Sequence, residues 1–325
     1  AQTGLGMSPQ FVWATKADAA TKAEPRVFSF IVPGYLVAIE EGWERNGEAL
    51  TQAQVEAEGS MVKDLAKRLF APAKGLTVIR NARVFDSVKG ALGEPSDVYV
   101  LRDRITAIVP AGSPDAGVDN EIDAGGRVLL PGLFDMHGHE FGRWNGGLHL
   151  AAGVTTVRDM GNDNKSLQGL IDENLRGELL GPRIVTAGFL EGESEFSARN
   201  GFVIKNFDEA KHAIDWYHQH GYPQLKIYNS FPKAILKDTV AYAHSRGMRV
   251  SGHVPAFLRA QDAVDAGFDE LQHINQLMLN FFVTPTTDTR TLERFRLPAE
   301  MTAGLDFDSR PVQDFIASLK KNDVA

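Results

Sequence analysis

The segment 131–273 alternates short apolar strands with amphipathic helices, and this order constrains the fold more than any other feature of the sequence. Strands that alternate with helices form parallel β–α units, because each helix carries the chain back to the start of the next strand. We expect strands at 133–139, 154–158, 183–187, 224–228, 248–253 and 270–273, and helices near 165–176, 208–220, 232–246 and 257–266. The predicted fold is α/β, a (β/α)8 TIM-like barrel with its site at the carboxyl ends of the strands.

The segment 131–325 is short for a closed barrel, which takes about 250 residues. We therefore expect a barrel truncated after strand 6. Beyond that strand, 281–297 is predicted to be an insertion or lid, and 311–321 a helix. An open barrel leaves unpaired strand edges, so a complementary chain or a homo-oligomer is an expected partner.

Two further parts are expected before the barrel. Residues 1–74 form an N-terminal extension with an amphipathic helix at 51–70 that Pro72 ends. Residues 75–130 form a small β-module, expected to be incomplete, with strands at 76–79, 82–85, 97–101, 104–109 and 121–123.

Composition excludes several classes of protein. The net charge is −8 and no polybasic run is present, so a nucleic-acid partner is not expected. The longest apolar run, 28–39, is broken by Pro33 and Gly34 and is too short to span a membrane. No cysteine is present, which leaves histidine, carboxylate or modified lysine as metal ligands. The compartment stays open, with a bacterial periplasmic or secreted location favoured over a cytoplasmic one.

Histidines and one lysine mark the predicted strand ends. His137 and His139 share one face of the first strand, because side chains alternate with a period of two. Lys226 lies in strand four, and His253 and His273 end strands five and six. Neutral imidazoles suit zinc or a similar divalent ion. A lysine amine that takes up carbon dioxide becomes an anionic carbamate that can bridge two metals.

These motifs resemble those of the metal-dependent amidohydrolase superfamily. The segments that carry the resemblance are PGLFDMHGH (131–139), GVTTVRD (153–159), LKIY (225–228), SGH (251–253) and LQH (271–273). The similarity is greatest to the binuclear, carboxylated-lysine subgroup that contains imidazolonepropionase-like proteins and Xaa-Pro-type dipeptidases. It covers residues 75 to about 280.

The resemblance implies a centre of two divalent metal ions, expected to be zinc. His137 and His139 would hold one ion, His253 and His273 the other, and carboxylated Lys226 would bridge them. A metal-bridging hydroxide would then cleave an amide or related C–N bond, with a dipeptide or N-acyl amino acid as the expected substrate. The family's strand-eight aspartate, which takes a proton from that water, has no counterpart that can be assigned here.

Two more residues are candidates for contact with substrate. Tyr228, on the same strand face as Lys226, is placed to hydrogen-bond an oxyanion or a substrate carboxylate. Arg158, at the end of strand two, is a candidate carboxylate-binding group. For both residues a purely structural hydrogen bond is an equally good interpretation.

Other polar clusters receive a structural interpretation. The pair His218 and His220 repeats the spacing of the strand-one pair, yet on a helix such residues point about 200° apart. His149, His212 and His244 are also expected on helices, and 191–195 is expected to be a solvated loop over the barrel mouth.

Two other functions remain open. One is a catalytically incompetent fragment or structural subunit that needs a complementary chain. The other is a mononuclear deaminase, which predicts one metal ion and an unmodified Lys226.

Overall fold

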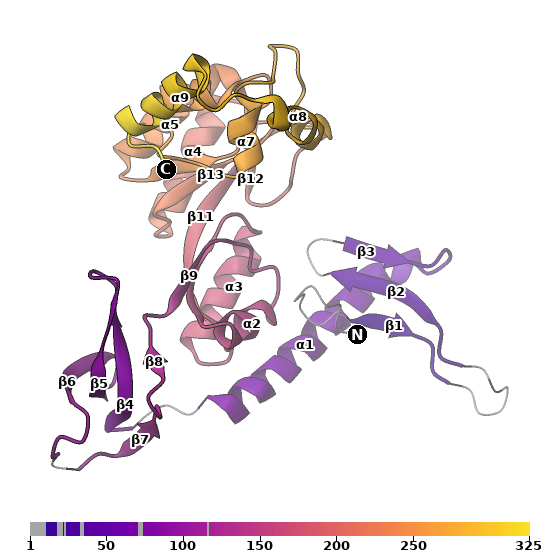
Figure 1. The fold of residues 1–325 in the computed structure, drawn as a ribbon. Coiled ribbons are helices and arrows are strands. Elements are labelled where there is room, and N and C mark those ends of the chain that lie inside the picture. The colour runs from indigo at the N-terminus through magenta and orange to yellow at the C-terminus, as the bar shows by residue number, and fades with distance from the viewer. Residues whose placement is uncertain (1–10, 18–21, 23, 33–35, 71–73, 116) are drawn as a thin grey trace.

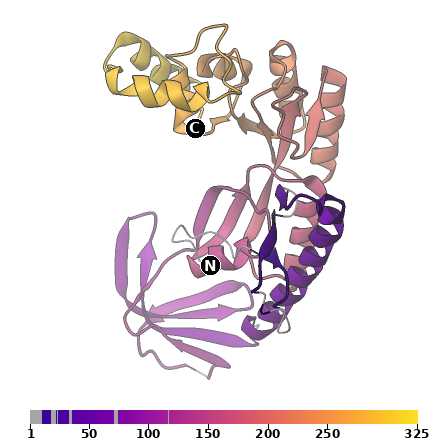
Figure 2. The same ribbon diagram turned by 90° about the vertical axis from the view of Figure 1, so that its right-hand side faces the viewer.

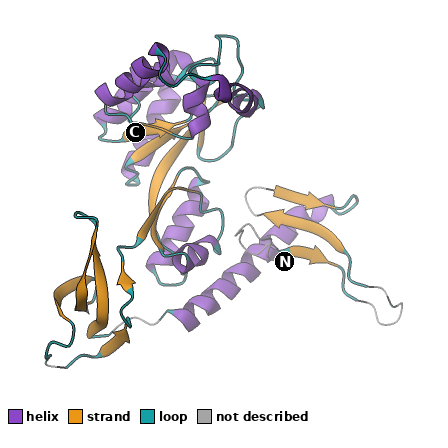
Figure 3. Ribbon diagram, viewed as in Figure 1, coloured by secondary structure: helices purple, strands orange, loops and turns teal. Residues whose placement is uncertain are grey.

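The computed structural model describes residues 11–325 except 18–21, 23, 33–35, 71–73 and 116. Figure 1 shows an elongated molecule in which an N-terminal sheet and helix, a small β-module and a larger α/β part lie next to one another. Figure 2 gives the same arrangement from the side, and Figure 3 separates helices from strands.

The first part is a three-stranded antiparallel sheet followed by a long helix. Its elements are β1 (Val12–Ala14), β2 (Val27–Val32), β3 (Leu36–Ile39), the 3-10 helix η1 (Glu44–Asn46) and α1 (Gly47–Leu69). The predicted helix is confirmed, although it begins at Gly47. Val62 on α1 is buried against Leu170 and Leu179, so this helix packs on the α/β part. The predicted breaks at Pro33, Gly34 and Pro72 lie outside the described residues.

The second part is a five-stranded sheet with the order β6-β5-β4-β7, in which β8 also pairs with β4. The strands are β4 (Leu76–Asp86), β5 (Ala91–Leu101), β6 (Arg104–Pro110), β7 (Asn120–Asp123) and β8 (Val128–Leu129). The two strands expected at 76–79 and 82–85 are one irregular strand. The irregularity lies between Ile79 and Ala82, where Asn81 has a φ of 51° and its amide donates to Asp97 at 2.9 Å.

The α/β part contains the six predicted parallel strands in sequence order, β9-β10-β11-β13-β14-β15. They are β9 (Leu133–Gly138), β10 (Val154–Asp159), β11 (Arg183–Gly192), β13 (Gln224–Ile227), β14 (Arg249–Gly252) and β15 (Glu270–Leu271), with β12 (Phe202–Ile204) beside the end of β11. The strands form a curled half-barrel (Figure 1). Within the described residues, β9 and β15 each pair with one strand, and the other side of β15 is covered by Ala325, whose carbonyl oxygen accepts from the amide of Leu271 at 2.9 Å.

Helices follow the strands as predicted. They are α2 (Asn145–Ala151), α3 (Asn164–Leu175), α4 (Phe207–Gln219), η2 (Lys233–Ile235), α5 (Leu236–Ser245) and α6 (Ala260–Ala266). Beyond β15 come α7 (Ile274–Leu279), α8 (Glu293–Met301), η3 (Thr302–Gly304) and α9 (Arg310–Lys321), so the expected insertion at 281–297 is partly helical. None of the helices in the described ranges has both the length and the apolar character needed to cross a membrane.

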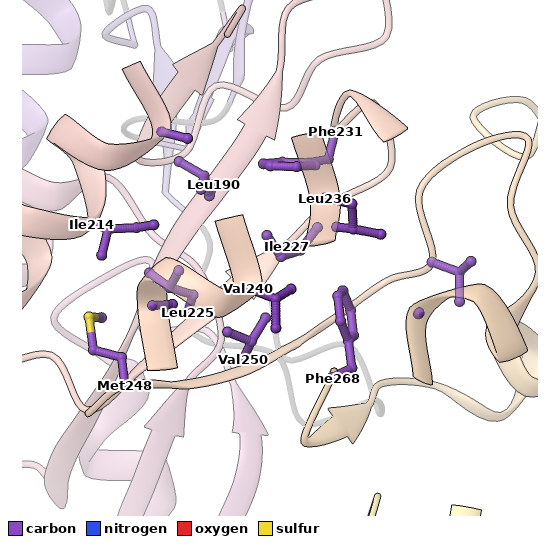
Figure 4. Close-up of a cluster of buried hydrophobic side chains, with 14 of the residues drawn as sticks. Leu190, Ile214, Leu225, Ile227, Phe231, Leu236, Val240, Met248, Val250 and Phe268 are labelled. Atoms are coloured by element: carbon purple, nitrogen blue, oxygen red, sulfur yellow. The ribbon is translucent and has the colours of Figure 1, made fainter. Parts of the chain in front are cut away.

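The main core lies between the half-barrel and its helices (Figure 4). Leu225 and Ile227 on β13 are fully buried in the same cluster as Ile214 of α4 and Val240 of α5. Because side chains alternate along a strand, this packing directs Lys226 to the opposite face, the interior of the half-barrel. The core therefore fixes the orientation of the lysine that the sequence singled out.

Candidate metal centre and active site

The histidine pair stands at the carboxyl end of β9. The ring centroids of His137 and His139 are 5.5 Å apart. Gly138 between them lies against β10, where an added Cβ would stand 2.4 Å from Cγ2 of Val157. The sequence thus needs glycine at this place so that β9 and β10 approach closely while the flanking imidazoles project from the strand.

Three of the imidazoles are oriented by a hydrogen bond to the nitrogen Nδ1. His139 contacts the carbonyl oxygen of Gly161 at 2.8 Å, and His253 contacts Oδ1 of Asn229 at 2.7 Å. His137 contacts Oε1 of Gln272 in the same way. With an oxygen as acceptor, Nδ1 donates the proton and Nε2 keeps its lone pair, the arrangement common in histidines that bind metals.

The ring of His273 stands close to two of the other imidazoles. The centroid of His273 is 4.4 Å from that of His137 and 4.8 Å from that of His253. Strand β15 ends at Leu271, so His273 lies beyond it, with a φ of 66°. Burial, followed by the charge of Lys226, lowers the pKa of His137 and of His273 to about 4. The same causes lower the pKa of His253 well below its ordinary value, so these imidazoles are neutral at pH 7.

Lys226 is buried, with 1% of its surface exposed, and its Nζ lies 3.5 Å from Nε2 of His137. Burial is the main cause that lowers its pKa to about 7, and the charge of Arg158 adds to it. A large share of this amine is therefore unprotonated at neutral pH. An unprotonated amine is the form that reacts with carbon dioxide.

These side chains line one cavity of about 630 Å³. Its wall contains all five predicted ligands together with Tyr228, and the remaining lining residues are Phe141, Phe189, Ala198, Arg199, Asn200, Asn275, Gln276, Arg294 and Phe295. The ring of Tyr228 lies 4.2 Å from that of His253 and 4.9 Å from that of Phe189. The structure thus brings the expected residues together from β9, β13, β14 and the segment after β15.

The described residues contain no group of three or more His, Asp, Glu or Cys side chains that could hold a metal ion as they stand. The fit of a metal therefore rests on the chemistry of the donors. Neutral imidazoles, an Nδ1 held by an oxygen acceptor and a buried amine are suited to a divalent ion.

Arg158 is not among the described residues that line this cavity. It is 9% exposed, and its guanidinium contacts both carboxylate oxygens of Glu270, at 2.7 and 2.5 Å. Its Nε also donates to the carbonyl oxygen of Met136 at 2.7 Å. Of the two interpretations for Arg158, the structure favours the structural one, an ion pair that joins β10 to β15.

The loop interpretation of residues 191–195 is wrong for Glu191. This residue belongs to β11 and is fully buried, whereas Glu193 and Glu195 are exposed as predicted. Its Oε1 accepts hydrogen bonds from the amides of Gly192 and Ser230, at 2.9 and 2.7 Å. Burial is the largest cause that raises its pKa to about 7. The apolar residues before Glu191, at 188–190, were the signal that this strand continues.

The residues that accept hydrogen bonds from the histidines were not predicted from the sequence. Gln272 stands directly before His273, and Asn229 follows Tyr228 at the end of β13, so position beside a predicted strand end was the available signal. The histidines interpreted as structural lie on α2, α4 and α5, and His218 and His220 are exposed at the end of α4, as predicted.

The architecture defines an α/β protein whose six parallel strands form a curled half-barrel. No family model matches the sequence. An adenine deaminase of Rhizobium johnstonii is 33% identical over 90 residues, which are 28% of this chain and 15% of that protein.

Solved structures show a similar fold. A Xaa-Pro dipeptidase with bound methionine superposes with a TM-score of 0.52 at 20% identity, over 63% of this chain and 64% of that one. Bottromycin amidohydrolase superposes with a TM-score of 0.57 at 19% identity, over 74% of this chain and 50% of that one. The chain spans less than two thirds of the length of each of these three proteins. The names of these proteins, an adenine deaminase, a dipeptidase and an amidohydrolase, agree with the predicted resemblance, and the structural matches show that the fold is shared.

Proposed function

We propose that this chain carries the metal-binding part of a hydrolase that cleaves an amide or related C–N bond in a small molecule or peptide. One observation supports this proposal above all others. Lys226 and four histidines, from β9, β13, β14 and the segment after β15, line a single cavity at the carboxyl ends of the half-barrel. In barrel enzymes this is the face at which chemistry takes place.

His137 and His139 would hold one divalent ion, His253 and His273 a second, and Lys226 as a carbamate would bridge them. When bound, such ions polarise a substrate carbonyl and lower the pKa of water. The hydrogen bonds that Gln272, Gly161 and Asn229 accept from the histidines would keep the ligand nitrogens aimed at the cavity, a contribution of about 10–100-fold in metal affinity.

Tyr228 has a separate role in this proposal. Its ring packs between Phe189 and His253 on the cavity wall, which limits the positions open to its hydroxyl. A fixed hydroxyl can donate a hydrogen bond to the carbonyl oxygen of the scissile bond as negative charge develops there. A dipeptide or an N-acyl amino acid is the substrate we propose.

A deaminase is the second candidate, because the sequence match is to adenine deaminases. It would use one metal ion and an unmodified Lys226. A non-catalytic part of a larger assembly is a third possibility, in which a complementary chain would pair with the outer edge of β9, which pairs with β10 alone among the described strands.

Zinc binding tests the proposal directly. Calorimetric titration of the full chain with zinc, in buffer that contains bicarbonate, should give two ions per chain, and His137→Ala with His139→Ala should remove at least one. A matched control is His218→Ala with His220→Ala, which changes the exposed pair on α4. Zinc binding by the native chain no stronger than by the His137→Ala/His139→Ala variant would contradict the proposal.

Two further measurements separate the candidates. Carbon-13 NMR after incubation with labelled bicarbonate should show a carbamate signal that Lys226→Met removes, whereas a deaminase would give one zinc and no such signal. Assays of N-acyl amino acids, dipeptides and adenine with the zinc-loaded chain then identify the reaction. A chain that binds two zinc ions but acts on none of these compounds, alone or with a co-purifying polypeptide, would support the non-catalytic alternative.

A further inference from the structure

The cavity wall has an unusual charge composition. Among the described lining residues, Arg199 and Arg294 carry guanidinium groups, while no aspartate or glutamate is present. The other polar lining residues, apart from the histidines, Lys226 and Tyr228, are the neutral amides Asn200, Asn275 and Gln276. A concave surface of this kind attracts a ligand that carries negative charge.

Arg294 is held in place at the start of α8. Its Cζ lies 4.6 Å from the centroid of the Phe295 ring, and its carbonyl oxygen accepts a hydrogen bond from Nδ2 of Asn275 at 3.2 Å. The latter bond ties α8 to α7, which begins directly after His273. The backbone and the side chain of Arg294 are thus both anchored beside the candidate metal ligands.

The guanidinium of Arg294 is incompletely satisfied. Its Nη1 is buried and has no hydrogen-bond partner in the part of the chain that the structure describes, where no ion pair of Arg294 is found either. Other arginines near the half-barrel have carboxylate partners, among them Arg158 with Glu270, Arg143 with Glu173 and Arg290 with Asp288. Because Arg294 lines the cavity and no described carboxylate pairs with it, its guanidinium remains available to a ligand anion.

We infer that Arg294, with Arg199 on the same cavity wall, binds a carboxylate of the substrate. This inference rests on the proposed function and assigns a binding site to the carboxylate that dipeptides and N-acyl amino acids share. A guanidinium presents paired N–H groups that match the two oxygens of a carboxylate. The assignment replaces Arg158, whose corresponding groups are already bonded to Glu270.

A pair of ligands that differ only in this group tests the inference. N-acetyl-L-phenylalanine and its carboxamide share the acyl bond and an aromatic ring suited to the Phe141, Phe189 and Phe295 walls. Calorimetry on the full chain after EDTA treatment measures their binding without hydrolysis. We expect the acid to bind about 10–100-fold more tightly than the amide, the range given by a charge-assisted hydrogen bond.

Variants then assign the preference to a residue. Arg294→Met should abolish the preference for the acid and change affinity for the amide less than about 2-fold, while Arg294→Lys should retain part of it. Arg296→Met is the matched control, because Arg296 lies on the same helix, is exposed and pairs with Glu293 and Glu300. Equal affinity of the native chain for acid and amide, undetectable binding of the acid, or an unchanged preference in Arg294→Met would overturn the inference.

Hydrolysis by the zinc-loaded chain provides a separate result. A preference for the acid in binding, with no cleavage of these compounds or of the other N-acyl amino acids and dipeptides, would leave the role of Arg294 standing and remove the hydrolase proposal. Cleavage of the compounds, combined with equal affinity for the acid and the amide, would support the hydrolase proposal and remove the role of Arg294. Circular dichroism of each variant confirms that its fold is intact before binding is compared.

Discussion

The ion pair between Arg158 and Glu270 offers a quantitative test of how the half-barrel is held together. It joins the second strand of the sheet to the last through two contacts, of 2.7 and 2.5 Å. Arg158 also donates to the carbonyl oxygen of Met136 on β9. One side chain therefore links β9, β10 and β15 through the interior of the half-barrel.

Arg158→Met removes the charge and keeps most of the volume. Breaking a fully buried ion pair costs about 3–5 kcal/mol, because the remaining charge is left without a partner. The Arg158 side chain is 10% exposed and that of Glu270 is 19% exposed, so water can partly solvate the carboxylate. We therefore expect Arg158→Met to lower the free energy of unfolding by about 2–3 kcal/mol. The double variant Arg158→Met/Glu270→Met should lie within about 1 kcal/mol of the native chain.

Urea denaturation of the four proteins of this cycle, followed by tryptophan fluorescence, measures the coupling energy. Arg143→Met with Glu173→Met is a parallel cycle on a pair that links loop and helix rather than strands. Additive effects of the Arg158 and Glu270 substitutions, or an Arg158→Met protein as stable as the native chain, would refute the argument.

The coupling energy between Arg158 and Glu270 should depend on pH. Burial alone would raise the pKa of Glu270, but the hydrogen bond and charge of Arg158 outweigh it and hold that pKa below its ordinary value of 4.5. A carboxylate whose pKa is lower in the folded state stabilises the fold above the unfolded-state pKa, and this contribution is lost as pH falls through the folded-state value. The coupling energy should therefore be constant at neutral pH and decline below about pH 4.5.

Two other predictions concern Glu191 and Tyr228. The pKa of Glu191 rises from 4.5 to about 7, so the folded state keeps its proton longer than the unfolded state, and the chain should lose up to about 3 kcal/mol of stability as pH rises from 4.5 to 7. Glu191→Gln should flatten this slope in urea titrations at several pH values, and an unchanged slope would show that Glu191 ionises normally. Tyr228→Phe should lower kcat/KM of the zinc-loaded, active enzyme by about 100-fold, the order of magnitude for an oxyanion donor, and an unchanged value would remove its role.

The parallel sheet and the positions of its histidines could be predicted because both follow from local rules. Strand and helix periods are visible within a few residues, and parallel strands bring their carboxyl ends to one side. His137, His139 and His253 were placed from these rules alone, and all line the cavity. His273 also lines it, although β15 ends before it.

Partners that are distant in the sequence could not be predicted. Arg158 bonds to a residue 112 positions later, and buried Glu191 accepts a hydrogen bond from Ser230, 39 positions later. No local pattern distinguishes an arginine at a strand end that faces a ligand from one that faces a carboxylate. The continuity of β4 could not be predicted for the same reason. Asn81 suggests a turn, but its backbone amide donates a hydrogen bond to Asp97 on β5, which keeps the strand continuous.

The comparison of Arg158 with Arg294 shows how function can be read once the partners are known. Both have little freedom to move, since one is bonded to Glu270 and Met136 and the other is held against Phe295. They differ in what their N–H groups contact, because those of Arg158 are used within the fold, while Arg294 keeps a buried Nη1 that no described residue satisfies. A fold gains stability from the first arrangement and loses it from the second. Because Arg294 lines the cavity and has no ion pair among the described residues, it is the arginine with which a substrate carboxylate would pair.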